Sequence, residues 1–88
     1  MSDEVDRLRA AIGANDRAIV AAVNERLRLV TELWELKHQL GVDLLDPDRE
    51  QRLRAELAAA NEGPLSAAGL ERLVDELLTL TKRELDGG

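Results

Sequence analysis

The sequence contains no cysteine, only one histidine and a single aromatic residue, Trp34. Without cysteine there can be no disulfide bonds or thiolate metal sites, and one histidine offers no cluster of metal ligands. We therefore expect no bound metal. A core with one aromatic side chain has to be built from aliphatic ones, and the excess of alanine, leucine, glutamate and arginine is typical of packed helices. The composition indicates an all-α protein.

Long apolar runs and a basic surface are missing as well. No stretch approaches the length of a membrane-spanning helix, and the start Met1–Glu4 lacks the cationic and apolar segments of a signal peptide. These features favour a cytoplasmic protein without membrane contact. Eighteen acidic and twelve basic side chains give a net charge of −6, and the two signs are interleaved, which argues against nucleic-acid binding. Any site for an anion has to be local.

The first half of the chain carries no proline, and its apolar residues recur mostly at three- and four-residue steps. This spacing predicts one long helix from about Asp3 to Leu40. Gly41 is placed to end that helix as a left-handed cap, and residues 42–45 then form a short connection.

Two shorter helices are predicted after this connection. Asp46 suits the N-cap of the second helix, with Pro47 at its first position, where the missing N–H costs nothing. That helix should stop near Asn61–Pro64, a cluster of helix breakers. Ser66 suits the N-cap of the third helix. The apolar stripe of the third helix consists of Leu70, Leu73, Val74, Leu77, Leu78, Thr81 and Leu85.

The length of the first helix predicts the oligomeric state. A helix from Asp3 to Leu40 is ~57 Å long, whereas a compact globule of 88 residues has a radius of gyration of ~12 Å. A single domain, residues 1–88, cannot cover an apolar stripe of that length. We therefore expect an entwined helical homodimer whose long helices run side by side. A monomer would require a break in the helix near Gly13 or Asn15, two weak helix formers.

Two cations share one side of the predicted long helix. Eleven positions separate Arg26 from Lys37, which brings them within ~20° of each other around the axis and ~16 Å apart along it. That side is otherwise apolar, so each charge needs a partner or a ligand when the helix packs. One interpretation is a site for an anionic small molecule. The other is that both side chains extend to solvent from the edge of the stripe or pair with carboxylates of a neighbouring helix.

Arg9 lies too far from these cations to share a ligand with them within one chain. Seventeen positions separate it from Arg26, or ~26 Å along the axis and ~100° around it. In an antiparallel dimer, however, Arg9 of one chain reaches the middle of the partner's long helix, close to Arg26 and Lys37. Each site then draws on both chains.

The polar residues of the three predicted helices recur at intervals that match a known family. These residues are Leu8-Arg9 with Ile12 and Asp16, then Glu25-Arg26, then Lys37, and then Asp46-Pro47-Asp48-Arg49-Glu50. Over nearly its whole length the chain resembles the AroQ-class, all-helical chorismate mutases. The resemblance implies an isomerase that converts chorismate to prephenate by a [3,3] sigmatropic rearrangement in the biosynthesis of phenylalanine and tyrosine. It also implies a dimer with two equivalent sites.

The resemblance assigns roles to four cations. Arg9 of the partner chain and Arg26 bind substrate carboxylates, Arg49 supports the carboxylate end, and Lys37 donates to both a carboxylate and the ether oxygen. A pericyclic rearrangement needs no nucleophile, metal or cofactor. It needs the dicarboxylate held in a compact conformer and positive charge near the breaking ether bond.

Two acidic residues correspond to the family's pocket for the ring hydroxyl. By resemblance, Glu50 accepts a hydrogen bond from that hydroxyl, and Asp46 lines the same pocket. The capping role of Asp46 is by itself a sufficient reason for an aspartate there.

The third predicted helix departs from the family pattern. Thr81 falls where the family often has a serine near the substrate carboxylate. Leu85 falls where the family has a glutamine or glutamate that touches the ether oxygen. A small shift in alignment places Glu84 or Arg83 there instead. Loss of one such donor costs two to three orders of magnitude in rate, or ~2.7–4 kcal/mol, so we expect low intrinsic activity.

The chain also resembles the short intracellular actinobacterial members of the family in its length and in its cationic, glycine-ended C-terminus. Those members are weak enzymes alone and are activated in a complex with DAHP synthase, the enzyme that opens the shikimate pathway. The resemblance implies the same partner here.

Other charged residues suggest no site. His38 is expected to be solvated at the helix end. Arg52 and Arg54 alternate with Glu50 and Glu56, a pattern typical of an exposed face with weak pairs inside one helix.

Two other functions fit the same fold. The pocket can serve a related substrate, as in mutases of 4-amino-4-deoxychorismate or lyases of isochorismate. Alternatively, the chain is a catalytically silent helical dimer that regulates a partner. Loss of the cationic set would be typical of a silent dimer, and here Arg9, Arg26, Lys37 and Arg49 are all present.

Overall fold

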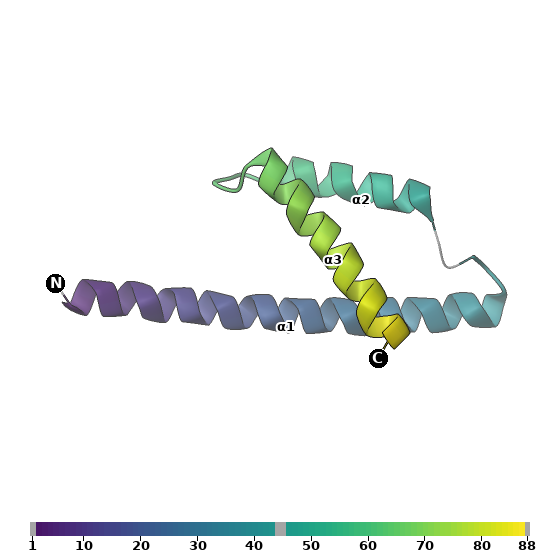
Figure 1. Ribbon diagram of the computed structural model, residues 1–88, viewed down its shortest axis with the longest axis horizontal. Helices are drawn as coiled ribbons and strands as arrows, with labels where there is room; N and C mark the ends of the chain where they lie inside the picture. The colour runs from purple at the N-terminus through teal and green to yellow at the C-terminus, as the bar shows by residue number, and fades with distance from the viewer. Residues whose placement is uncertain (1, 44–45, 88) are drawn as a thin grey trace. The chain divides into compact units, whose positions relative to one another are not determined.

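The computed structural model describes residues 2–43 and 46–87. Their regular structure consists of three helices, and no strand occurs among them (Figure 1). The helices are α1 (Ser2–Leu40), α2 (Pro47–Ala60) and α3 (Ala67–Gly87). The predicted all-α class and the order of one long and two shorter helices are confirmed. The chain divides into two units, residues 1–33 and residues 34–88, and each is described by itself.

Helix α1 is continuous over its 39 residues (Figure 1). It passes through Gly13 and Asn15 without interruption, so the break that a monomer would require is not there. Asp3 and Glu4 lie in its first turn, where carboxylates interact favourably with the positive end of the helix dipole. None of the described residues of α1 is buried.

The end of α1 is fixed by the predicted glycine cap. Gly41 has a φ of 68°, a conformation that costs glycine little. The backbone N–H of Val42 donates to the Lys37 carbonyl at 2.9 Å, and that of Gly41 donates to the His38 carbonyl at 3.3 Å. These two bonds form a Schellman motif, which satisfies carbonyls that the helix leaves open. Of the connection predicted over 42–45, Leu44 and Leu45 lie outside the described residues.

The boundaries of α2 and α3 also follow from local signals. Asp46 caps α2 and Pro47 opens it, as predicted, while Asn61 forms its C-cap. The turn that follows contains Gly63 with a φ of 79°. Ser66 caps α3, because its Oγ accepts from the backbone N–H of Gly69 at 3.0 Å.

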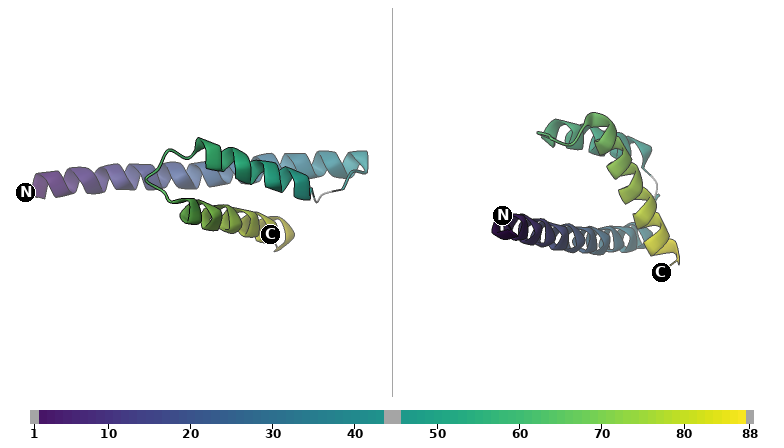
Figure 2. Two further views of the ribbon diagram at one scale, coloured as in Figure 1. Left: turned by 90° about the horizontal axis from the view of Figure 1, so that it is seen from above. Right: turned by 60° about the vertical axis from the view of Figure 1, so that its left-hand side comes forward.

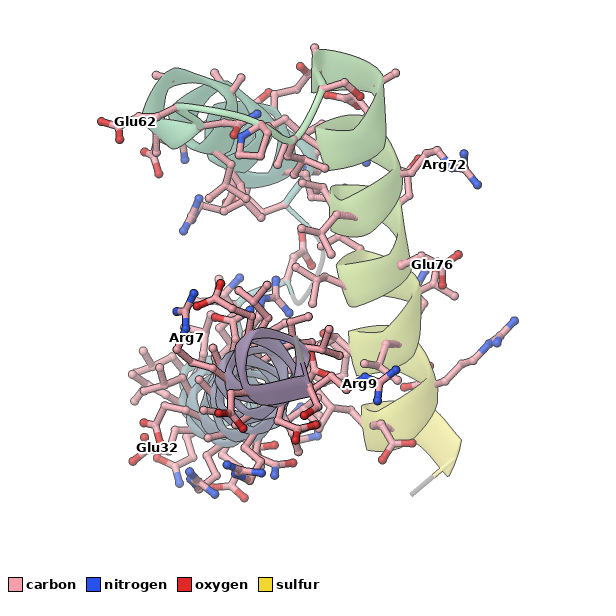
Figure 3. All side chains as sticks on the ribbon, turned by 90° about the vertical axis from the view of Figure 1, so that its left-hand side faces the viewer. Arg7, Arg9, Glu32, Glu62, Arg72 and Glu76 are labelled. Atoms are coloured by element: carbon pink, nitrogen blue, oxygen red, sulfur yellow. The ribbon has the colours of Figure 1, made fainter. Side chains whose placement is uncertain are left out.

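Helices α2 and α3 pack on each other and form the core of the second unit (Figure 2). Leu70 and Val74 of α3 are buried, while Leu53 and Leu57 of α2 are half-buried. Helix α3 is strongly amphipathic, since Arg72 and Glu76 project from the side that faces away from α2 (Figure 3). Of its predicted stripe, Leu73 lies at the edge and is 48% exposed. Within the described residues no helix contains a segment apolar enough to cross a bilayer.

Candidate active site

The cations predicted on the first helix differ in exposure. Arg26 and Lys37 are half-buried and Arg9 is exposed. Figure 3 looks along α1 from its N-terminal end and shows Arg7 and Arg9 leaving the helix on different sides. Arg9 and Arg26 belong to the first unit and Lys37 to the second. The Schellman motif at the end of α1 fixes the backbone of the turn that carries Lys37, because the Lys37 carbonyl accepts the bond from the backbone N–H of Val42 at 2.9 Å.

The first turn of α2 brings three predicted site residues together. The carboxylate of Asp46 accepts from the backbone N–H of Arg49 at 3.1 Å, and its carbonyl accepts from the N–H of Glu50 at 3.2 Å. The side chains of all three are exposed. The cap therefore holds the backbone from which Arg49 and Glu50 project and leaves their charged ends accessible to a ligand.

Arg54 does not lie on a solvated face with pairs inside its own helix, and that prediction was wrong. Its Nη1 donates to Glu71 Oε2 at 2.8 Å and its Nη2 donates to Asp75 Oδ1 at 2.6 Å, so both partners belong to α3. The Arg54 side chain is 29% exposed. The hydrogen bond to Asp75 and the negative charges of both partners raise the pKa of the Arg54 guanidinium, against the opposing effect of desolvation.

Sequence reasoning missed this cluster because its members are 17 and 21 positions apart. The sequence nevertheless contains a sign that Arg54 faces another helix. Arg54 follows Leu53 and precedes Leu57 by three positions, so it lies on the side of α2 that carries the aliphatic residues. Arg52 is exposed, as predicted.

The predicted residues of α3 lie on one side of the helix. Thr81 is buried, and its hydroxyl donates to the Leu77 carbonyl at 2.7 Å. A hydrogen bond from Thr81 to a substrate carboxylate would require that hydroxyl to turn away from Leu77. Leu85, four positions later, is half-buried, whereas Glu84 and Arg83 are exposed. The burial pattern thus favours Leu85 over its neighbours as the residue on the side of Thr81.

A hollow of about 540 Å³ lies on a different side of α3. It is lined by Thr79, Lys82, Arg83 and Asp86. Thr79 is ~200° from Thr81 around the helix. This hollow lies among exposed side chains, and of the residues weighed for the site it contains only Arg83, the alternative to Leu85.

Comparison with known proteins identifies the family. Residues 8–84 match the family model described as chorismate mutase type II. The chain belongs to this family. The matched range includes every predicted site residue except Leu85, which lies one position beyond it.

Two known proteins are similar to this chain over most of its length. The 4-amino-4-deoxychorismate mutase of Streptomyces pristinaespiralis is 34% identical over 84 residues, which cover 93% of this chain and 64% of that protein. The chain thus spans a little less than two thirds of that relative's length. The structure of a chorismate mutase, Form I, from Thermus thermophilus has a TM-score of 0.84 and 32% sequence identity. That match covers 89% of this chain and 98% of the other.

Proposed function

We propose that this protein is a chorismate mutase, an isomerase that rearranges chorismate to prephenate for the synthesis of phenylalanine and tyrosine. The observation that carries the proposal is the cationic set, Arg9, Arg26, Lys37 and Arg49, within the range that matches the chorismate mutase type II family. A dicarboxylate needs such cations, and a generic amphipathic helix does not need arginine or lysine on its apolar side. No cofactor is required.

The proposed mechanism uses position and charge alone. Arg26, Arg49 and the partner's Arg9 hold the two carboxylates so that the ends that form the new C–C bond meet in the compact conformer. Lys37 donates to a carboxylate and to the ether oxygen, which gains electron density as its C–O bond breaks. All four cations extend from helices, which fix the backbone positions from which they reach the substrate.

The proposed active form is a homodimer in which each site draws on both chains. Support comes from α1, because most of the stability of a helix in a protein comes from the packing of its apolar face. The part of α1 in the first unit carries large apolar side chains that are exposed to solvent. Their exposed fractions are 45% for Val5, 51% for Leu8, 60% for Ile12 and 53% for Ile19. A second α1 running alongside would cover this stripe. Residues 1–88 would then act as one chorismate mutase domain.

The ring substituent of the substrate is proposed to meet Glu50, with Asp46 beside it. A carboxylate accepts a hydrogen bond from a hydroxyl, and it accepts one equally well from an ammonium group. The similarity to a 4-amino-4-deoxychorismate mutase therefore supports a second candidate function, rearrangement of the amino analogue.

Substrate comparison separates the two candidates. We expect kcat/KM for chorismate to exceed that for 4-amino-4-deoxychorismate, measured on one preparation by the loss of each substrate. A preference for the amino analogue would transfer the assignment to the second candidate. Failure to consume either compound would favour a silent regulatory dimer.

Thr81 and Leu85 are proposed to line the carboxylate and ether ends of the pocket. Leu85 has no hydrogen-bond donor, so the second contact to the ether oxygen is missing, and we propose that the isolated protein is a slow catalyst. Activation by a DAHP synthase partner follows from the resemblance to the short intracellular members, which also supports a cytoplasmic location. In a titration with DAHP synthase the mutase rate should rise and saturate, whereas a flat response would exclude this partner.

A further inference from the structure

A polar contact between α2 and α3 involves a residue with no role in the proposed mechanism. Arg54 of α2 holds Glu71 and Asp75 of α3 with separate nitrogens, at 2.8 and 2.6 Å. We call these three residues the Arg54 clamp. The Arg54 side chain is 29% exposed, although the two acidic side chains are 57% and 62% exposed. The Arg54 side chain as a whole is thus mostly covered, while its partners remain near solvent.

The clamp attaches α2 to α3 at two points. Glu71 and Asp75 are four positions apart, so they lie on one side of α3, one turn or ~6 Å from each other. The guanidinium is planar and rigid, so holding both carboxylates fixes its direction as well as its position. A lysine at position 54 could not do this, because an ammonium is a point charge on a flexible stem.

The apolar part of the α2–α3 contact does not fix the rotation of α2 in this way. It consists of aliphatic side chains, half-buried in α2 and buried in α3. Burial of apolar surface is non-directional, so this contact restrains a small rotation of α2 about its own axis less sharply than a two-point ionic contact does. The clamp supplies the directional restraint.

Rotation of α2 would affect the proposed site because Glu50 lies on the same helix, one turn before Arg54. Glu50 precedes Arg54 by four positions, so the two side chains extend from the same side of α2, ~40° and ~6 Å apart. A rotation of α2 by ~20° moves a side-chain end at a radius of ~6 Å by ~2 Å. A displacement of about 1 Å is enough to cost ~100-fold in rate when a group has to meet a substrate.

We propose that Arg54 is a positioning residue, which sets the rotation of α2 on α3 through Glu71 and Asp75 and thereby holds the Glu50 carboxylate against the ring substituent of the substrate. This inference rests on the proposed chorismate mutase activity. Arg54 does not touch the substrate. It acts through Glu50.

The first test compares Arg54→Met with Arg52→Met. Arg52 is an exposed arginine on the same helix two positions earlier, so its replacement removes the same charge outside the clamp. We expect kcat/KM for chorismate to fall at least about tenfold in Arg54→Met and to stay within about twofold of the wild type in Arg52→Met. Both are measured at a temperature where circular dichroism shows unchanged helicity. Equal activity of the two variants would overturn the proposal.

A second pair of variants keeps the test decisive if Arg54→Met does not fold. The double variant Glu71→Gln/Asp75→Asn removes the charges of both acceptors and leaves Arg54 in place. The double variant should lower kcat/KM about as much as Arg54→Met does. Arg54→Lys should have a kcat/KM between those of Arg54→Met and the wild type. Full activity of the double variant would show that the clamp has no bearing on turnover.

The Glu50→Gln background separates positioning from a general loss of stability. If Arg54 acts mainly through Glu50, Arg54→Met should lower kcat/KM by a clearly smaller factor once Glu50 has been replaced, because the main group it positions is gone and only the displacement of Arg49 remains. A purely structural role predicts the full loss in both backgrounds and would contradict the inference. Wild-type protein without turnover would overturn the proposed function, and this inference with it. Active wild type with a normal Arg54→Met variant would overturn this inference alone.

Discussion

The carboxylate of Asp46 caps α2 by accepting from the backbone N–H of Arg49 at 3.1 Å. One side chain thereby fixes the turn that carries Arg49 and Glu50. The family resemblance implies that Asp46 lines the pocket for the ring substituent. The structure shows that Asp46 is the N-cap of α2.

Replacement of Asp46 distinguishes these two roles. Asp46→Ala removes the cap, and we expect it to lower stability by ~1 kcal/mol, which corresponds to a fall in Tm of roughly 4–8 °C for a domain of this size. Asp46→Asn keeps an oxygen that can accept from Arg49 and should leave Tm within about 2 °C of the wild type, since asparagine caps as well as aspartate. Thermal unfolding followed by circular dichroism measures both.

The same two variants report on the pocket. If capping is the main role of Asp46, Asp46→Asn retains most of the wild-type kcat/KM. Normal Tm together with a large loss of activity in Asp46→Asn would instead assign the carboxylate to the substrate.

Arg26 is expected to serve the ligand rather than the fold. Arg26→Ala should lower kcat/KM by about 10²–10³, because it removes a pre-positioned charge, while leaving the helix content and the dimer intact. Arg28→Ala is the matched control. Arg28 is two positions later on α1, 68% exposed, and paired with Glu25 at 2.8 Å. Near-normal turnover in Arg26→Ala would rule out the proposed site.

Mixing two inactive variants tests whether each site draws on both chains. In a mixed dimer of Arg9→Ala and Arg26→Ala chains, one site receives Arg9 and Arg26 intact and the other receives neither. Random exchange of equal amounts therefore should restore about a quarter of the wild-type activity. Sites confined to one chain predict no recovery, and that result would contradict the shared site.

Leu85→Gln should raise turnover of the isolated protein. The substitution supplies a donor where the family has one and should increase kcat by about 10² if the side chain reaches the ether oxygen. Glu84→Gln is the control, because Glu84 is exposed and its neighbour Leu85 is half-buried. A larger gain from the control than from Leu85→Gln would show that position 84, rather than position 85, meets the substrate.

The helices and their ends could be predicted because their signals are local. Gly41, Asp46 and Ser66 each cap a helix through bonds to residues no more than four positions away, so their neighbours in sequence determine their role. The periodicity of α1 likewise predicted a helix that continues through Gly13 and Asn15.

Contacts between helices were harder to predict. Alternating charges around Arg54 suggested pairs within α2, yet its partners Glu71 and Asp75 are on α3. Their pairing depends on how α2 rotates on α3, which the spacing of charges along one helix does not specify. The hydroxyl of Thr81 donates to the carbonyl of Leu77 within α3, and its place near a substrate carboxylate stays a prediction. The sharing of Arg9 between two chains rests on the proposed dimer and stays a prediction.

The central claim is that this chain rearranges chorismate. The most direct measurement follows the loss of chorismate absorbance and the formation of prephenate with purified wild-type protein, alone and with DAHP synthase from the same organism. We predict prephenate in equal amount to the chorismate consumed, at a low rate that rises with the partner. Chorismate loss no faster than the uncatalysed reaction under both conditions would contradict the account.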